Sequence, residues 1–92
     1  PKNLYKSFKY YKLAAEGGNG YAQYFIGYMY NLGKGIEKNK LYGYMWLNLA
    51  SSQNLEEAVK MRNELDKRLL KKDILISQDM SIECQEKDYK NC

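Results

Sequence analysis

The sequence contains two cysteines, Cys84 and Cys92, and these are its side chains best suited to covalent chemistry. If one helix ran through both, about 1.5 Å of rise per residue would leave the sulfurs roughly 12 Å apart along its axis, too far for a disulfide. The intervening segment is long enough for the helix to stop near Lys87 or Asp88 and for the chain to turn back. We therefore expect a Cys84–Cys92 disulfide; the alternative is one half-buried thiol and one loose terminal thiol.

The state of these cysteines bears on the compartment. A disulfide persists in the periplasm or outside the cell, whereas the cytosol keeps thiols reduced. The predicted bond therefore favours a periplasmic or secreted protein, and two free thiols would favour a cytoplasmic one. The sequence begins at Pro1 and shows no signal peptide, but a processed N-terminus would have lost one.

The other residue types and motifs in the sequence argue against catalysis. The sequence has no histidine, so the usual general base and the commonest metal ligand are both missing, and nothing would activate the Cys84 thiol. Gly33-Lys34-Gly35 is too short for a phosphate-binding loop and follows no predicted strand. No cluster has metal-ligand spacing. We therefore expect a non-enzymatic protein with no cofactor and no metal.

One group of carboxylates shares a predicted helix with lysines at neighbouring helical positions. The residues are Glu56, Glu57, Glu64 and Asp66, with Lys60 and Lys67. This arrangement is typical of charge pairs within a helix rather than of acid–base catalysis. Across the whole sequence, the basic and acidic residues are interleaved and the net charge is only +4. We therefore expect solvated helix faces and no nucleic-acid partner. No apolar run is long enough for membrane insertion.

The 92 residues allow one small domain, and that domain is internally repeated. A shift of 36 residues superposes several identical residues: Lys2 on Lys38, Asn3 on Asn39, Leu13 on Leu49, Ala14 on Ala50 and Ala22 on Ala58. Aromatic and small positions also align, with Phe8 on Tyr44, Tyr10 on Trp46 and Ser7 on Gly43.

Helix-breaking residues and the helical spacing of apolar residues predict five helices and no strand. They cover residues 4–16, 21–32, a segment after the N-cap Asn39, about 55–69 and about 72–87. A start of the last helix at Ser77 is the alternative. Asn54 and Glu57 have the spacing of a capping box. Small residues and one tryptophan should form the packing positions between helices: Ser7, Ala14, Ala22, Gly27, Gly43, Trp46 and Ala50. In the first helix, Tyr10 and Tyr11 share the stripe of Ser7 and Ala14.

The stretch Ala14–Gln23, followed by Ile26–Tyr30 and Gly33–Ile36, resembles the Sel-one-like repeat, a relative of the tetratricopeptide repeat. The resemblance covers Lys2 to about Ala58, and Asn63 departs from it where Gly27 lies one repeat earlier. It implies an all-α right-handed solenoid of antiparallel helix pairs. The repeats would occupy 1–71, with one complete repeat at about 18–53 and partial repeats on either side. A capping helix and tail over 72–92 are similar to the closing helix of many bacterial members.

Residues 1–3 align with the end of an inter-repeat loop. We therefore expect the 4–16 helix to be the second helix of an earlier pair, and the natural chain to extend upstream.

Members of this family act as adaptors, which implies a scaffold that binds a peptide or protein on its concave face. In tetratricopeptide-like stacking the 21–32 helix lines that face. The binding candidates are Tyr21, Tyr24, Tyr28 and Asn31, with Glu57, Lys60, Glu64 and Lys67 one repeat later. Tyrosine suits such a surface because it gives a large contact area at low entropy cost. The alternative is that these tyrosines cover neighbouring helices.

Two other functions compete with the scaffold. Cysteine-rich members of the family have been described as penicillin-binding or β-lactamase-like envelope proteins, but they carry a cysteine pair in each repeat. This chain has no cysteine between Pro1 and Glu83. A purely structural spacer, with no soluble partner, is the third possibility.

Overall fold

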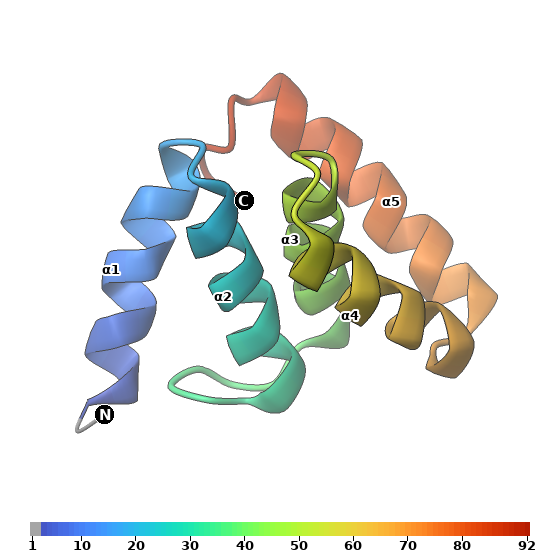
Figure 1. The fold of residues 1–92 in the computed structure, drawn as a ribbon, viewed down its shortest axis with the longest axis horizontal. Coiled ribbons are helices and arrows are strands. Elements are labelled where there is room, and N and C mark those ends of the chain that lie inside the picture. Colours follow the sequence, from blue (N-terminus) through green and yellow to red (C-terminus); the bar gives the residue numbers. More distant parts are fainter. Residues whose placement is uncertain (1–2) are drawn as a thin grey trace.

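The computed structural model describes residues 3–92 as five α-helices with no strand among them (Figure 1). The helices are α1 (Leu4–Glu16), α2 (Gly20–Leu32), α3 (Lys40–Ser51), α4 (Glu56–Arg68) and α5 (Lys71–Glu86). The predicted all-α class is confirmed, and each predicted helix limit lies within one residue of the observed one. Two details of the sequence prediction lie outside the described residues. They are the N-terminal limit of the repeat region, at Pro1, and Lys2, which was aligned with Lys38.

Asparagine side chains start the first three helices. The Oδ1 atoms of Asn3, Asn19 and Asn39 each accept a hydrogen bond, at 2.9–3.0 Å, from the backbone N–H three residues later. Each bond satisfies a helical N–H group that has no partner within the helix. Two of these caps, at Asn3 and Asn39, lie 36 residues apart, so the period includes the helix starts.

The predicted capping box at Asn54 is wrong. Leu55 is the N-cap of α4, and no side-chain hydrogen bond caps that helix. Asn54 instead has a left-handed backbone with φ of 64°. Asparagine tolerates this conformation better than most residues, so Asn54 turns the chain between α3 and α4 rather than capping α4.

Two glycines set the contact between α2 and α3. A Cβ atom on Gly27 would lie 2.7 Å from Cγ of Leu47 and 3.0 Å from the carbonyl oxygen of Gly43. A Cβ atom on Gly43 would lie 3.2 Å from the backbone nitrogen of Asn31. The two helix backbones therefore meet directly, and both positions are buried. Only residues without a side chain fit here.

This close pairing is not repeated one period later. The positions 36 residues after the two glycines hold Asn63 and Asp79, which are exposed. In Figure 1, α4 and α5 splay apart instead of pairing, and α5 packs against α3. The small, buried Ser77 and Ser81 allow this approach, and their hydroxyls donate to the carbonyls of Leu41 and Met45 at 3.0 and 3.3 Å.

The core joins residues of α1, α2, α3 and α5, and Trp46 is fully buried within it. Other members are Phe8, Ala15, Ala22, Ile26, Met29, Met45, Leu49 and Cys84. A second cluster of Tyr44, Leu47 and Leu65 joins α3 to α4. The structure therefore places Trp46 at the centre of the helix packing.

The 36-residue period extends to tertiary contacts. The ring of Phe8 on α1 meets that of Tyr30 on α2 edge to face, with centroids 5.3 Å apart. The equivalent residues one period on are Tyr44 and Asp66, and the Tyr44 hydroxyl donates to Oδ1 of Asp66 at 2.7 Å. Burial raises the pKa of the Tyr44 hydroxyl, and the bond to Asp66 raises it further. The hydroxyl therefore keeps its proton and remains a donor.

Replacing Tyr44 by phenylalanine should lower the free energy of unfolding by about 1 kcal/mol, because it removes a hydrogen bond to a carboxylate that is itself exposed. Chemical denaturation would measure the change. In an Asp66→Ala background the same replacement should cost much less. Equal costs in the two backgrounds would show that the bond contributes nothing to stability.

The predicted packing stripe of α1 is not buried within residues 3–92. Phe8 and Ala15 face α2, whereas Ala14 is exposed, Ser7 is half-buried and Tyr10 is 63% exposed. Tyr11, on the same stripe, is also exposed. The equivalent positions of α3, which are Gly43, Trp46, Leu47 and Ala50, are all buried. The stripe has the expected spacing, but no described helix covers it, since the main helix contact of α1 is with α2.

Candidate functional site

A groove of about 510 Å³ runs between α2 and α4. It is lined by Tyr24, Asn31 and Leu32 of α2, and by Glu57, Lys60, Met61, Glu64, Leu65 and Arg68 of α4. Five of the eight residues predicted to bind a partner therefore lie together: Tyr24, Asn31, Glu57, Lys60 and Glu64. The two helices come from successive repeats, so the 36-residue period brings equivalent surfaces to the two walls.

Helix α3 positions both walls of the groove. On one side, Gly27 and Gly43 hold α2 against α3. On the other side, α4 is fixed to α3 by Leu65, which packs in the cluster of Tyr44 and Leu47. Tyr24 packs against the same cluster. The groove floor therefore rests on the core, while its rims remain open to solvent.

The floor and the rims of the groove differ in chemistry. Tyr24, Met61 and Leu65 are buried or half-buried and make the floor apolar. Leu32, at the end of α2, is 47% exposed and forms an apolar rim. Such a surface can take an apolar side chain of a partner out of water.

The charges along α4 pair mostly with one another. Lys60 Nζ lies 3.1 Å from Glu56, and Glu64 lies 3.5 Å from Lys67 and 3.8 Å from Arg68. The predicted charge pairing within this helix is confirmed for Glu56 with Lys60 and for Glu64 with Lys67, whereas Asp66 accepts a hydrogen bond from Tyr44 of α3. All these side chains are more than half exposed, so each pair contributes little to stability. Because these pairs are weak, they can be exchanged for pairs with a bound segment at little cost.

The other three predicted residues lie outside the groove. Tyr21 is 55% exposed near the start of α2, and Lys67 faces solvent. Tyr28 lines a separate depression of about 260 Å³ between α1 and α2. That depression shares Tyr11 and Phe25, whose ring centroids are 5.0 Å apart. The tyrosines predicted to share one face of α2 therefore border two different surfaces, the groove beside α4 and the depression beside α1.

Sequence reasoning did not identify four of the groove residues: Leu32, Met61, Leu65 and Arg68. Met61 follows Glu57 by four residues and Leu65 follows Met61 by four, so the helical spacing of α4 contained this signal. Leu32 carried no comparable signal. Its exposure depends on where α2 ends, at the left-handed Gly33, and on the angle of α4.

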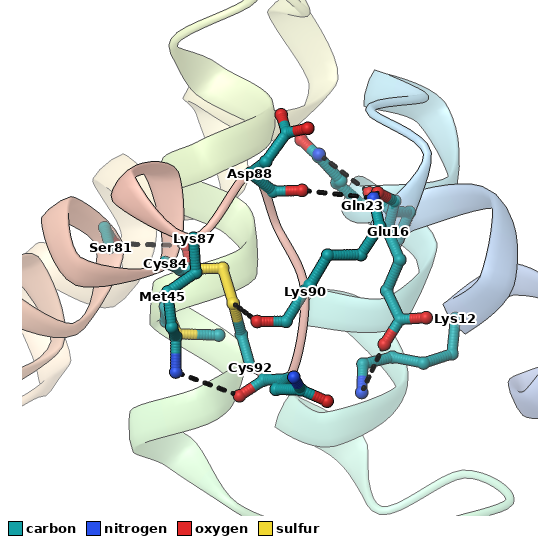
Figure 2. Close-up of a disulfide and its surroundings, with 12 residues drawn as sticks. Lys12, Glu16, Gln23, Met45, Ser81, Cys84, Lys87, Asp88, Lys90 and Cys92 are labelled. Atoms are coloured by element: carbon teal, nitrogen blue, oxygen red, sulfur yellow. Dashed lines mark hydrogen bonds and ion pairs between the residues drawn. A yellow bond between two sulfur atoms is a disulfide. The ribbon is translucent and has the colours of Figure 1, made fainter.

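The cysteines lie near the end of α5 and in the tail that follows it (Figure 2). The helix ends at Glu86, and the Cys84 and Cys92 sulfurs are 2.03 Å apart, at disulfide distance, with Cα atoms separated by 5.7 Å. Left-handed backbone at Asp88, Tyr89 and Asn91 turns the chain back. The helix therefore stops where the predicted bond requires it to stop.

Across residues 3–92, no group of three or more histidine, cysteine or acidic side chains could hold a metal ion. Within the same residues, no helix has both the length and the apolar character needed to cross a bilayer.

Comparison with protein families gives one result. The family model of the Sel1 repeat matches residues 1–19 and 20–55, which together make up more than half of the chain. The second match contains α2, α3 and the turn that follows, and the first contains α1. Comparison with curated proteins and with solved structures gives no match.

Proposed function

The chain belongs to the Sel1 repeat family, and from this premise we propose that it is a non-enzymatic scaffold whose α2–α4 groove binds a segment of a protein partner. Sel1 repeats generally mediate protein–protein interactions. The observation that carries the proposal is the groove itself, because it joins an apolar floor and the apolar rim at Leu32 to a charged wall on α4. The groove is formed by equivalent helices of two successive repeats.

The groove chemistry specifies the kind of segment. Tyr24 and Met61 on the floor, and Leu32 on the rim, fit one or two apolar anchor side chains. The carboxylate of Glu57 and the guanidinium of Arg68 lie on the α4 wall, so they can pair with charges that flank the anchors. We therefore propose an amphipathic peptide with an apolar centre and charges of both signs as the ligand. Such anchors usually supply most of the binding energy of an interface.

The test uses peptides selected against the folded chain from a random display library. A groove variant, Leu32→Asp with Lys60→Glu, should bind the selected peptides at least about 10-fold more weakly, because it places charge on the apolar rim and reverses charge on the α4 wall; tenfold corresponds to about 1.4 kcal/mol. Isothermal titration calorimetry would measure the affinities.

A matched control makes the same changes elsewhere. Leu75→Asp with Lys72→Glu alters an equally exposed leucine and lysine on α5, away from the groove. This control should keep the affinity of the unaltered chain. Peptides that bind the groove variant and the control equally well would place the binding surface elsewhere. Failure to select any peptide would oppose the scaffold function.

The compartment forms part of the proposal. A cysteine pair at disulfide distance supports a periplasmic or secreted location, because such a bond survives only outside the reducing cytosol. Mass spectrometry of the native, non-reduced protein would test it. Two thiols open to alkylation would remove this argument.

A further inference from the structure

The tail after α5 lies against the corner between α1 and α2, far away in the sequence (Figure 2). Lys90 Nζ donates a hydrogen bond to the carbonyl oxygen of Glu16 at 2.6 Å, across 74 residues of chain. The ring of Tyr89 covers Gly18, where a Cβ atom would lie 3.7 Å from Cε2 of the tyrosine. The tail therefore contacts both the end of α1 and the turn that leads into α2.

The tail also completes the core at this corner. Tyr89 and Cys92 pack against the cluster that contains Phe8, Ala15 and Cys84. Helix α5 itself packs on α3, so the tail extends the contacts of the last helix to the N-terminal pair. The α1–α2 corner thus depends on a segment of a few residues at the far end of the sequence.

That segment needs a constraint to hold its shape. Asp88, Tyr89 and Asn91 all have positive φ angles, between 56° and 66°. Aspartate and asparagine tolerate this conformation better than most residues, but the bulky Tyr89 keeps it only when the surroundings enforce it. The backbone N–H of Tyr89 donates to the carbonyl of Cys84 at 2.9 Å, and the sulfur pair closes the same loop. The covalent closure is the strongest of these constraints.

We propose that the Cys84–Cys92 bond is a redox-controlled clamp that holds the α1–α2 corner against the end of α5. When the bond is formed, the tail keeps Lys90 on Glu16 and Tyr89 on Gly18. Two-electron reduction by a dithiol breaks the sulfur–sulfur bond and leaves two protein thiols, while the dithiol becomes a cyclic disulfide. The tail then leaves its left-handed conformation, and the corner loses both contacts.

The surroundings of the bond give a reductant access. Cys84 is only 1% exposed, but Cys92 is half-buried at the end of the chain. A cavity of about 160 Å³ opens beside both cysteines and is also lined by Met80 and Lys87. A dithiol can therefore attack the Cys92 sulfur, and Cys84 is the buried leaving group.

Hydrogen–deuterium exchange, followed by mass spectrometry, tests the clamp on the full chain. The oxidised protein and the same protein reduced with dithiothreitol are compared under native conditions. We expect peptides that contain residues 17–19 to exchange at least about 10-fold faster after reduction. The amides of Gly18 and Asn19, which now donate to Ala15 and Ala14, report this opening. Peptides from α4 should not change.

Two variants separate the clamp from local loosening of the tail. Lys90→Met with Tyr89→Ala keeps both cysteines and removes the two contacts, so it should speed exchange at residues 17–19 without reduction. Cys84→Ser with Cys92→Ser should resemble the reduced protein and should not respond to dithiothreitol. If the serine variant does not fold, reduction of the unaltered protein decides alone.

Faster exchange confined to residues 87–92 would overturn the clamp. The same conclusion would follow if the native protein already held two free thiols. The proposed groove function does not enter this test, because no partner is present.

Discussion

Replacing Trp46 by alanine should lower the free energy of unfolding by about 3–5 kcal/mol. The side chain is fully buried, and it packs in the cluster that joins α1, α2, α3 and α5. Truncation leaves a cavity bordered by four helices, and each of these is held by other contacts and cannot simply move inward. A chain of 92 residues has a small margin of stability, so the variant should be largely unfolded near 37 °C.

The matched variant is Trp46→Phe. It keeps an aromatic ring in the cavity and removes the indole Nε1–H, which is buried and has no hydrogen-bond partner within residues 3–92. Losing an unpaired donor partly offsets the lost volume, so this variant should cost only about 1–2 kcal/mol. Circular dichroism during urea unfolding measures both variants, since neither retains a tryptophan to report by fluorescence. An alanine variant as stable as the unaltered chain would mean that Trp46 is not the centre of the core.

Helix-breaking residues and helical spacing predicted the helix limits and the buried Trp46. The resemblance to the Sel-one-like repeat supported the close contact of Gly27 with Gly43. Helical spacing also predicted the stripe of α1 that includes Tyr10 and Ala14, and here the structure differs. Helical spacing shows which residues share a face, but whether that face is covered depends on a neighbouring helix, and no described helix supplies one.

The groove was predictable only in part, for a related reason. Tyr24 and Tyr28 lie on the same face of α2, and spacing alone did not separate them. In the structure they border different surfaces, because α4 lies on one side of α2 and α1 lies on the other. The angle of α4 depends on its contact with α3 through Tyr44 and Leu65. That information is tertiary, and no local pattern contains it.

Helices α4 and α5 splay apart, whereas α2 and α3 pair closely, and the difference lies in whether glycine occupies the contact positions. Helices α2 and α3 pack backbone to backbone because Gly27 and Gly43 have no side chains. Helices α4 and α5 carry Asn63 and Asp79 at the equivalent positions, and burying those polar side chains in a close helix contact would cost free energy. The last helix therefore packs on α3 through serines, and its outer face stays in solvent. The sequence departs from the repeat pattern at the hairpin whose two helices do not pair closely.

Replacing Gly27 by alanine should therefore destabilise the protein, although the same change stabilises an open helix. Alanine favours a helix over glycine by about 1 kcal/mol. Here the added Cβ atom would lie 2.7 Å from Cγ of Leu47 and 3.0 Å from both the Leu47 nitrogen and the Gly43 oxygen. Two of these atoms are backbone, so relief requires α3 to move away from α2. We expect a net loss of about 2–3 kcal/mol, in the upper part of the range for overpacking.

The control for Gly27→Ala is Asn63→Ala, one period later. Asn63 occupies the equivalent position of α4, is exposed, and has no helix packed on it within residues 3–92. Alanine there should raise the free energy of unfolding by up to about 0.7 kcal/mol through helix propensity alone. Urea denaturation of both variants gives effects of opposite sign if the helix contact decides the outcome. Two stabilising effects would show that α2 and α3 do not meet at their backbones, and the argument that glycine sets this pairing would be lost.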